Sequence, residues 1–114
     1  MNINESMAEV MGWHKEHCDW FDGMAYVREL GDSVLLVNDW RPDTDLSQVM
    51  MCVFEAKNKH KLAFNFWISE TLNSIRIFDM DKQSECVWKD KIPDDKLALT
   101  ICSAILEAME LDDD

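Results

Sequence analysis

Three residues near the N-terminus have side chains that commonly bind zinc. His14, His17 and Cys18 form an H-x-x-H-C cluster. A structural zinc site needs about four such ligands held in a tetrahedron, and no second pair at a usable spacing follows in the sequence. The third histidine, His60, falls at the far end of a predicted helix. We therefore expect no bound metal and interpret the cluster as a partly exposed polar turn.

Acidic residues in the middle of the chain could supply oxygen ligands to a calcium ion. Asp39, Asp43 and Asp45 follow one another closely, as acids do in calcium-binding loops. The EF-hand pattern also needs a glycine at its sixth position and a glutamate at its twelfth, and the sequence has neither. Helix capping and turn formation explain these acids better, and the same holds for Asp79 and Asp81.

The sequence contains no recognisable catalytic motif. It has no glycine-rich phosphate loop, nucleophile elbow or H-E-x-x-H sequence, and only three glycines in all. Carboxylate pairs are abundant, but among 23 acidic residues no single pair is informative. We therefore expect a protein that binds rather than catalyses, without a cofactor. The alternative from another class is a small enzyme or nucleotide-binding protein that uses Trp20, Tyr26 and Trp40 as an aromatic pocket.

The overall charge is strongly negative. The 23 acids and 11 bases give a formal net charge of −12 at pH 7. Such a charge repels nucleic acid and anionic membranes and attracts proteins with basic surfaces. The basic residues gather locally in one small patch, which is too limited to neutralise a phosphate backbone. The patch comprises Lys57, Lys59, His60 and Lys61. We expect no direct binding to nucleic acid or membrane.

Two groups of acids precede the second and third predicted helices. Carboxylates displayed at intervals along one edge can imitate a phosphate backbone and occupy a basic groove on a nucleic-acid-binding protein. The simpler alternative is a solvated acidic face without a partner. The candidate partner-binding residues are Asp39, Asp43, Asp45, Asp90, Asp94 and Asp95.

Length and composition indicate one globular domain spanning residues 1–114. The four cysteines form no C-x-x-C pair, so we expect buried free thiols. The N-terminus lacks the basic start and long apolar run of a secretory signal. No segment approaches the roughly 20 apolar residues that span a bilayer. These features predict a cytoplasmic protein.

Hydrophobic spacing predicts three helices that position the acids. A first helix is expected from Asn2, its cap, to about Gly12. The clearest helix follows Pro42, and Asp43, Thr44 or Asp45 can cap it. Its apolar residues fall on one face, at i, i+3, i+4, i+7 and i+8. That stripe is Leu46, Val49, Met50, Val53 and Phe54.

The last helix is predicted to begin at Pro93 and Asp94, where proline and acids are well tolerated. Negative charge at the far end of a helix is unfavourable, so we expect residues 110–114 to form a frayed acidic tail. The inward stripe of this helix is Leu97, Ile101, Ala104, Ile105 and Ala108.

Strands are expected at 62–69, 75–80 and 85–89, and their short connections predict an antiparallel meander. Large apolar residues occur on both faces of this sheet, so we expect both faces to be covered. Residues 13–38 are rich in aromatic side chains that should pack over the core, with short strands at 24–28 and 34–37. The prediction is an α+β fold, specifically an α/β/α sandwich whose antiparallel sheet has three or more strands and helices on both faces.

Three segments resemble the phage ABA sandwich domain, a family of small phage and prophage proteins. They are VMGW (Val10 to Trp13), DWRPDTDLSQV (Asp39 to Val49) and PDDKLALTICSAILEAM (Pro93 to Met109). Members typically show a first helix ending in M-G-W, a W-x-P-S-T-D start to the middle helix and an A-P-x-A-I-C-x-A-A-L-like last helix. Here Asp43 replaces the serine of the second motif. The resemblance implies an α/β/α sandwich of phage origin and transfers no catalytic or binding residues.

Charge and resemblance together lead to one functional expectation. Small acidic phage proteins without enzymatic motifs often act on host machinery. We expect an inhibitor of a host defence system in the bacterial cytoplasm, comparable to an anti-CRISPR protein, that engages a basic nucleic-acid-binding surface. The alternative is an accessory phage protein, structural or regulatory, whose charge serves only solubility. A homodimer is left open, because exposed tryptophans could form an interface.

Overall fold

The computed structural model describes residues 2–18, 23–28 and 33–112. Its helical elements are α1 (Ile3–Val10), the 3-10 turn η1 (Val37–Asp39), α2 (Leu46–Lys59), the 3-10 turn η2 (Asp94–Lys96) and α3 (Leu97–Asp112). One antiparallel sheet contains β1 (His14–Cys18), β2 (Gly23–Val27) and β3 (Ser33–Leu36) in this order. The second contains β4 (Leu62–Ile68), β5 (Asn73–Asp79) and β6 (Ser84–Lys89). These elements confirm the predicted α+β class.

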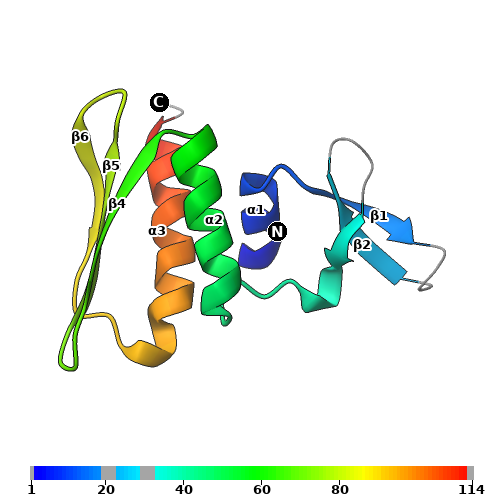
Figure 1. Cartoon of the computed structure of the whole chain (residues 1–114), viewed down its shortest axis with the longest axis horizontal. Coiled ribbons are helices and arrows are strands. Elements are labelled where there is room, and N and C mark those ends of the chain that lie inside the picture. The colour runs from blue at the N-terminus through cyan, green and yellow to red at the C-terminus, as the bar shows by residue number, and fades with distance from the viewer. Residues whose placement is uncertain (1, 19–22, 29–32, 113–114) are drawn as a thin grey trace.

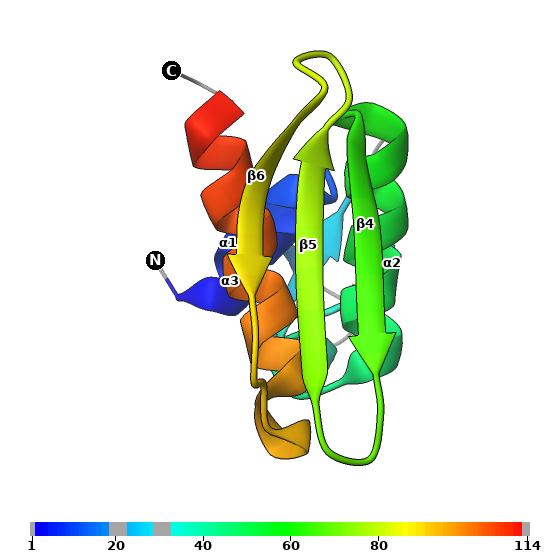
Figure 2. The same cartoon turned by 90° about the vertical axis from the view of Figure 1, so that its left-hand side faces the viewer.

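The helices form a layer between the two sheets. Helices α2 and α3 lie side by side and run in the same direction, so both begin at the lower end of the view in Figure 1. The sheet β4–β5–β6 packs on one side of this pair, and α1 packs on the other (Figures 1 and 2). The sheet β1–β2–β3 lies beyond α1 (Figure 1).

Helix α2 begins as predicted, but its buried stripe is rotated from the predicted one. Asp45 is the N-cap, and its Oδ1 accepts a hydrogen bond from Gln48 N at 3.1 Å. Leu46 and Phe54, both expected to be buried, are 46% and 57% exposed. The buried residues are Val49, Cys52, Val53 and Ala56. Small side chains let the helix approach α1 and α3 closely, so the buried side is the one rich in small residues.

Helix α3 is the central element and buries the stripe predicted for it. It contacts α1, α2, β5 and β6. All five predicted residues are buried: Leu97, Ile101, Ala104, Ile105 and Ala108. The helix continues to Asp112, so it includes part of the segment predicted as a frayed tail. Residues 113–114 of that tail lie outside the described part of the chain.

The β4–β5–β6 sheet is an antiparallel meander, as predicted. Its inner face contributes Ile75, Ile77 and Val87 to the core beneath α3. Its outer face is open: Trp67 and Trp88 are 64% and 56% exposed. The expectation that helices cover both faces is therefore not met, since among the described residues no helix packs on this outer face (Figure 2). The two long helices pack against each other on the same side instead.

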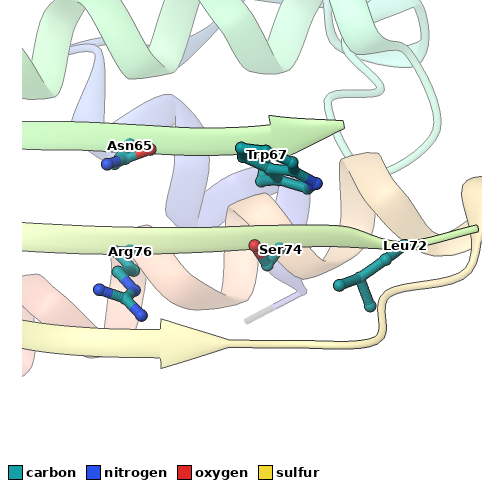
Figure 3. Close-up of a pocket in the computed structure, with 5 residues that line it drawn as sticks. All are labelled: Asn65, Trp67, Leu72, Ser74 and Arg76. Atoms are coloured by element: carbon teal, nitrogen blue, oxygen red, sulfur yellow. The ribbon is translucent and has the colours of Figure 1, made fainter. Parts of the chain in front are cut away.

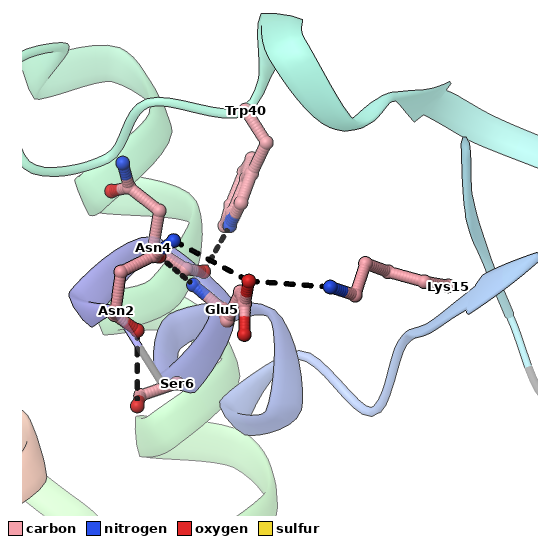
Figure 4. A network of polar contacts seen from close by, with 6 residues as sticks. All are labelled: Asn2, Asn4, Glu5, Ser6, Lys15 and Trp40. Carbon is pink, nitrogen blue, oxygen red and sulfur yellow. Dashed lines mark hydrogen bonds and ion pairs between the residues drawn. The ribbon is translucent and has the colours of Figure 1, made fainter. Parts of the chain in front are cut away.

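Aromatic side chains pack together where the N-terminal sheet meets the helices, as predicted. The Trp13 ring lies 4.7 Å from the Trp40 ring and 6.2 Å from the Tyr26 ring, between centroids. Trp40 Nε1 donates a hydrogen bond to Asn4 O at 2.9 Å, which ties the segment before α2 to α1 (Figure 4). The predicted strands at 24–28 and 34–37 correspond to β2 and β3.

The segment predicted as a polar turn is strand β1. Its five residues pair in register with β2, from His14 opposite Val27 to Cys18 opposite Gly23. The polar composition suggested a turn, but a neighbouring strand can pair with any backbone that presents free N–H and C=O groups. Lys15 then reaches back from β1 to Glu5 of α1 at 3.2 Å (Figure 4).

Candidate binding surfaces

Helices α2 and α3 begin at the same end of the molecule (Figure 1), and the two predicted groups of acids lie in the segments that lead into them. One group lies in η1 and in the segment before α2, and the other lies between β6 and α3. Burial is the main cause of the raised pKa of the Cys102 thiol in α3, and the negative charge of Asp43 adds to it. We call these six aspartates together the acidic end. Its members are Asp39, Asp43, Asp45, Asp90, Asp94 and Asp95.

Some aspartates of the acidic end have structural roles. Asp45 caps α2, and Asp94 Oδ1 accepts a hydrogen bond from Asn73 Nδ2 at 2.6 Å. Asp43 is half-buried, and its backbone N donates to Asn4 Oδ1 at 3.2 Å. The carboxylates of Asp45 and Asp94 are needed locally, so their presence does not by itself indicate a partner.

The remaining aspartates of the acidic end point to solvent. Asp39, Asp90 and Asp95 are exposed. Asp90 Oδ1 accepts only from the backbone N of its neighbour Lys91, at 2.8 Å. Within the described ranges, none of the six aspartates forms an ion pair. The acidic end therefore keeps its negative charge exposed to an approaching molecule.

A second candidate surface is the outer face of the β4–β5–β6 sheet. A shallow pocket of about 270 Å³ lies on it (Figure 3). The Arg76 guanidinium lies 5.1 Å from the centre of the Trp88 ring, a cation–π distance. This face offers aromatic stacking and one cation. The pocket is lined by Asn65, Trp67, Leu72, Ser74 and Arg76. Sequence reasoning missed this site because alternating large residues suggested a covered sheet.

A third candidate is a cleft of about 410 Å³ between the end of α1, helix α2 and the end of β2. Lys59 and Glu55 pair across its rim at 3.3 Å. The cleft is lined by Met11, Gly12, Trp13, Arg28, Met51, Glu55 and Lys59. The aromatic pocket considered from the sequence is different: Tyr26 and Trp40 are buried in the core and do not line this cleft, and Trp20 lies outside the described residues.

The chain matches no protein-family model, no curated protein and no solved structure. The resemblance to the phage ABA sandwich domain is thus a prediction that the comparisons leave untested.

Histidine and cysteine side chains are the remaining candidates for chemistry. No group of three or more His, Cys, Asp or Glu side chains in that part of the chain is arranged to hold a metal ion. His14 Nε2 instead lies 3.6 Å from Glu16 Oε2 on β1. Burial raises the pKa of Cys52 and of Cys102 to about 12, so both thiols are protonated and unreactive at neutral pH.

None of the described helices combines the length and the hydrophobicity that crossing a membrane requires.

Proposed function

We propose that this protein acts by binding another protein, and that its acidic end engages a basic surface normally used to bind nucleic acid. The observation that supports this proposal is that helices α2 and α3 begin at the same end of the molecule, each preceded by aspartates of which Asp39, Asp90 and Asp95 are exposed. Carboxylates spaced along such an end attract a basic groove over several ångströms and speed association.

The targets that fit this chemistry are nucleases and other nucleic-acid-binding proteins. A basic groove on such a protein contacts phosphates through Lys and Arg, and carboxylates can take the place of these phosphates. We propose an inhibitor of a host defence system, comparable to an anti-CRISPR protein, that acts in the cytoplasm of a bacterium. This part of the proposal rests on charge and on the phage resemblance.

Two simpler roles for the acids compete with this proposal. Acids at a helix start stabilise the helix through its positive pole, without any partner. A high net charge also keeps a small protein soluble. With either role the protein would be an accessory phage protein, structural or regulatory. Asp39, Asp90 and Asp95 separate these possibilities, because their carboxylates neither cap a long helix nor bond to a buried group.

The test compares two triple variants that have the same net charge. The first carries Asp39→Asn, Asp90→Asn and Asp95→Asn at the acidic end. The control carries Glu9→Gln, Glu16→Gln and Glu85→Gln, three exposed acids that lie elsewhere on the molecule. Each tagged protein is used to capture partners from bacterial lysate at low and at high salt, with identification by mass spectrometry.

The proposal predicts that the parent and the control capture the same nucleic-acid-binding protein at low salt. Capture should weaken steeply at high salt, because exposed charges are screened. Added nucleic acid should release the captured protein, because both ligands occupy one groove. The acidic-end variant should capture much less of it. Equal capture by both triple variants, or capture that nucleic acid does not affect, would reject the proposal and favour the accessory role.

A further inference from the structure

Strand β4 lies at the edge of its sheet and has none of the usual protection of an edge. Its sequence LAFNFWI contains no charged residue and no proline. Its pairing with β5 is continuous from Leu62 to Ile68, without a bulge. In the described part of the chain, no backbone group between Ala63 and Ile68 bonds to anything beyond β5. Every second residue therefore presents a free N–H and C=O to the outside.

The opposite edge of the same sheet is protected. Strand β6 contains Glu85 and Lys89, and its pairing with β5 is interrupted between Ile77 and Phe78. Lys89 Nζ also binds Glu107 Oε2 of α3 at 2.8 Å. Charges and bulges are common ways to prevent an edge strand from pairing with another chain. The contrast between the two edges singles out β4 as available for pairing.

Apolar side chains border the free edge along its length. Ile68 at the end of β4 is 66% exposed, and Trp67 beside it is also mostly exposed. On the inner face, the rings of Phe64 and Phe66 stack with centroids 6.0 Å apart and are only half-buried. An uncharged backbone edge flanked by exposed apolar side chains is typical of an interface.

Helix α2 adds a second apolar stripe on the β4 side. Met51 and Glu55 turn toward α1, because they line the cleft next to Trp13. Leu46, Met50 and Phe54 recur every four residues and fall on the other flank of the helix. That flank faces β4, the one strand of the second sheet that α2 contacts closely. We call Leu46, Met50, Phe54, Phe64, Phe66 and Ile68 the β4 strip.

We propose that the β4 strip is the interface of a homodimer, in which β4 pairs antiparallel with β4 of a second copy. The two meanders then form one six-stranded sheet, and the two α2 helices face each other across the axis. An antiparallel strand pair has a natural two-fold axis, so one surface serves both copies. Pairing satisfies the free backbone groups of both edges at once.

Charge restricts the places where a second copy can pack. Two chains of charge −12 repel each other, so they can associate closely only through a surface without acids. The stretch from Leu62 to Ile68 has no acid.

A standard interface buries roughly 800 Å² per partner. The exposed part of Phe54 supplies roughly 100 Å² of this, from a side chain of roughly 150–250 Å². Ile68, Leu46 and the strand backbone add to that area.

The test measures molecular mass by sedimentation equilibrium over a range of protein concentrations. The parent should be a dimer. Ile68→Lys and Phe54→Lys should each raise the dissociation constant by about tenfold or more, because each places a charge where an apolar side chain is buried between the two copies. The controls Met80→Lys and Trp88→Lys replace similarly exposed residues outside the β4 strip. They should leave the dissociation constant of the dimer unchanged. Because all four changes make the net charge less negative, a loss of dimer must be local.

A second measurement is independent of any variant. Hydrogen exchange of the β4 amides should slow as protein concentration rises, whereas exchange in β6 should not change. Circular dichroism checks that each variant is folded. A parent that stays monomeric, a dimer that survives both Ile68→Lys and Phe54→Lys, or one lost with Trp88→Lys overturns the proposal. The last result would assign the interface to the open sheet face instead.

Discussion

Asn73 in β5 and Asp94 at the start of η2 are joined by a hydrogen bond of 2.6 Å, in which Asn73 Nδ2 donates to Asp94 Oδ1. The same Nδ2 donates to Ile92 O at 3.0 Å, and Ile92 N donates to Asn73 O at 3.0 Å. Asn73 is buried, so these bonds fix the segment before α3 against the sheet. One aspartate of the acidic end is therefore a structural residue, and it is excluded from the partner-binding test for that reason.

Asn73→Ala should lower the free energy of unfolding by about 2–3 kcal/mol, because it removes two hydrogen bonds, one of them to a carboxylate. Urea unfolding followed by circular dichroism at fixed protein concentration measures this. Ser74→Ala, one residue along the same strand on the open face, should change stability by less than about 0.5 kcal/mol. Similar small effects from both variants would contradict a structural role for Asn73.

Asp45→Ala should lower stability by about 1 kcal/mol, because the first turn of α2 loses its N-cap acceptor for Gln48 N. Asp45→Asn keeps an acceptor and should restore most of the loss. The exposed Asp95 provides the comparison: Asp95→Ala should have a smaller effect on the same urea curve. If Asp45→Asn and Asp45→Ala were equally destabilised, charge at the helix start rather than capping would be the cause.

Trp40→Phe should destabilise the protein by about 1–3 kcal/mol, because Asn4 O loses its donor in a mostly buried site. The Trp40 side chain is 2% exposed, so water cannot readily replace that bond. Trp88→Phe makes the same chemical change at an exposed position and should have little effect. Thermal unfolding monitored by far-ultraviolet circular dichroism compares the two, and equal melting temperatures would argue against the Trp40 bond.

Cys52 and Cys102 should resist alkylation by iodoacetamide at pH 8 in the folded protein, because their pKa values of about 12 keep both thiols protonated. Cys86 is only half-buried and should react faster. Peptide mapping by mass spectrometry gives the three rates, and unfolding in urea should equalise them. Fast labelling of Cys52 in the native protein would show that the core opens there.

The same two thiols predict how stability changes with pH. An unfolded thiol ionises near the ordinary pKa of 9.0, whereas the folded ones ionise near 12. Above about pH 9 the unfolded chain therefore binds fewer protons, and raising the pH favours unfolding. The buried thiols contribute fully to the free energy of unfolding below about pH 9, and this contribution is lost as the pH rises from about 9 to about 12. In the Cys52→Ala variant, the free energy of unfolding measured in urea should fall less steeply with pH between about 9 and 12.

Local sequence determined most of the elements. The spacing of apolar residues identified α2, α3 and the three-stranded meander, because the periods of a helix and a strand are set by backbone geometry alone. The caps followed from side chains that bond to nearby amides: Asn2 Oδ1 accepts from Glu5 N at 2.9 Å, and Asp45 caps α2. The acids before both helices were visible in the sequence for the same local reason.

Only the tertiary structure decided which sides of these elements are covered. Leu46 and Phe54 were predicted to be buried in α2. The helix packs its small residues against α1 and α3 instead, so these two side chains are exposed. Strand β1 was predicted as a polar turn. Its own residues do not indicate a strand, which forms because β1 pairs with β2.

The candidate surfaces depend on the same distinction. Trp67 and Ile68 looked like core residues, and they are exposed because both long helices pack on one side of the sheet, which leaves the other side and the β4 edge free. Burial depends on what packs against a residue, and contacts between distant segments are not encoded in local spacing. The sequence by itself thus determined the helices, the strands and the charge, whereas packing between distant segments decided which residues face a partner.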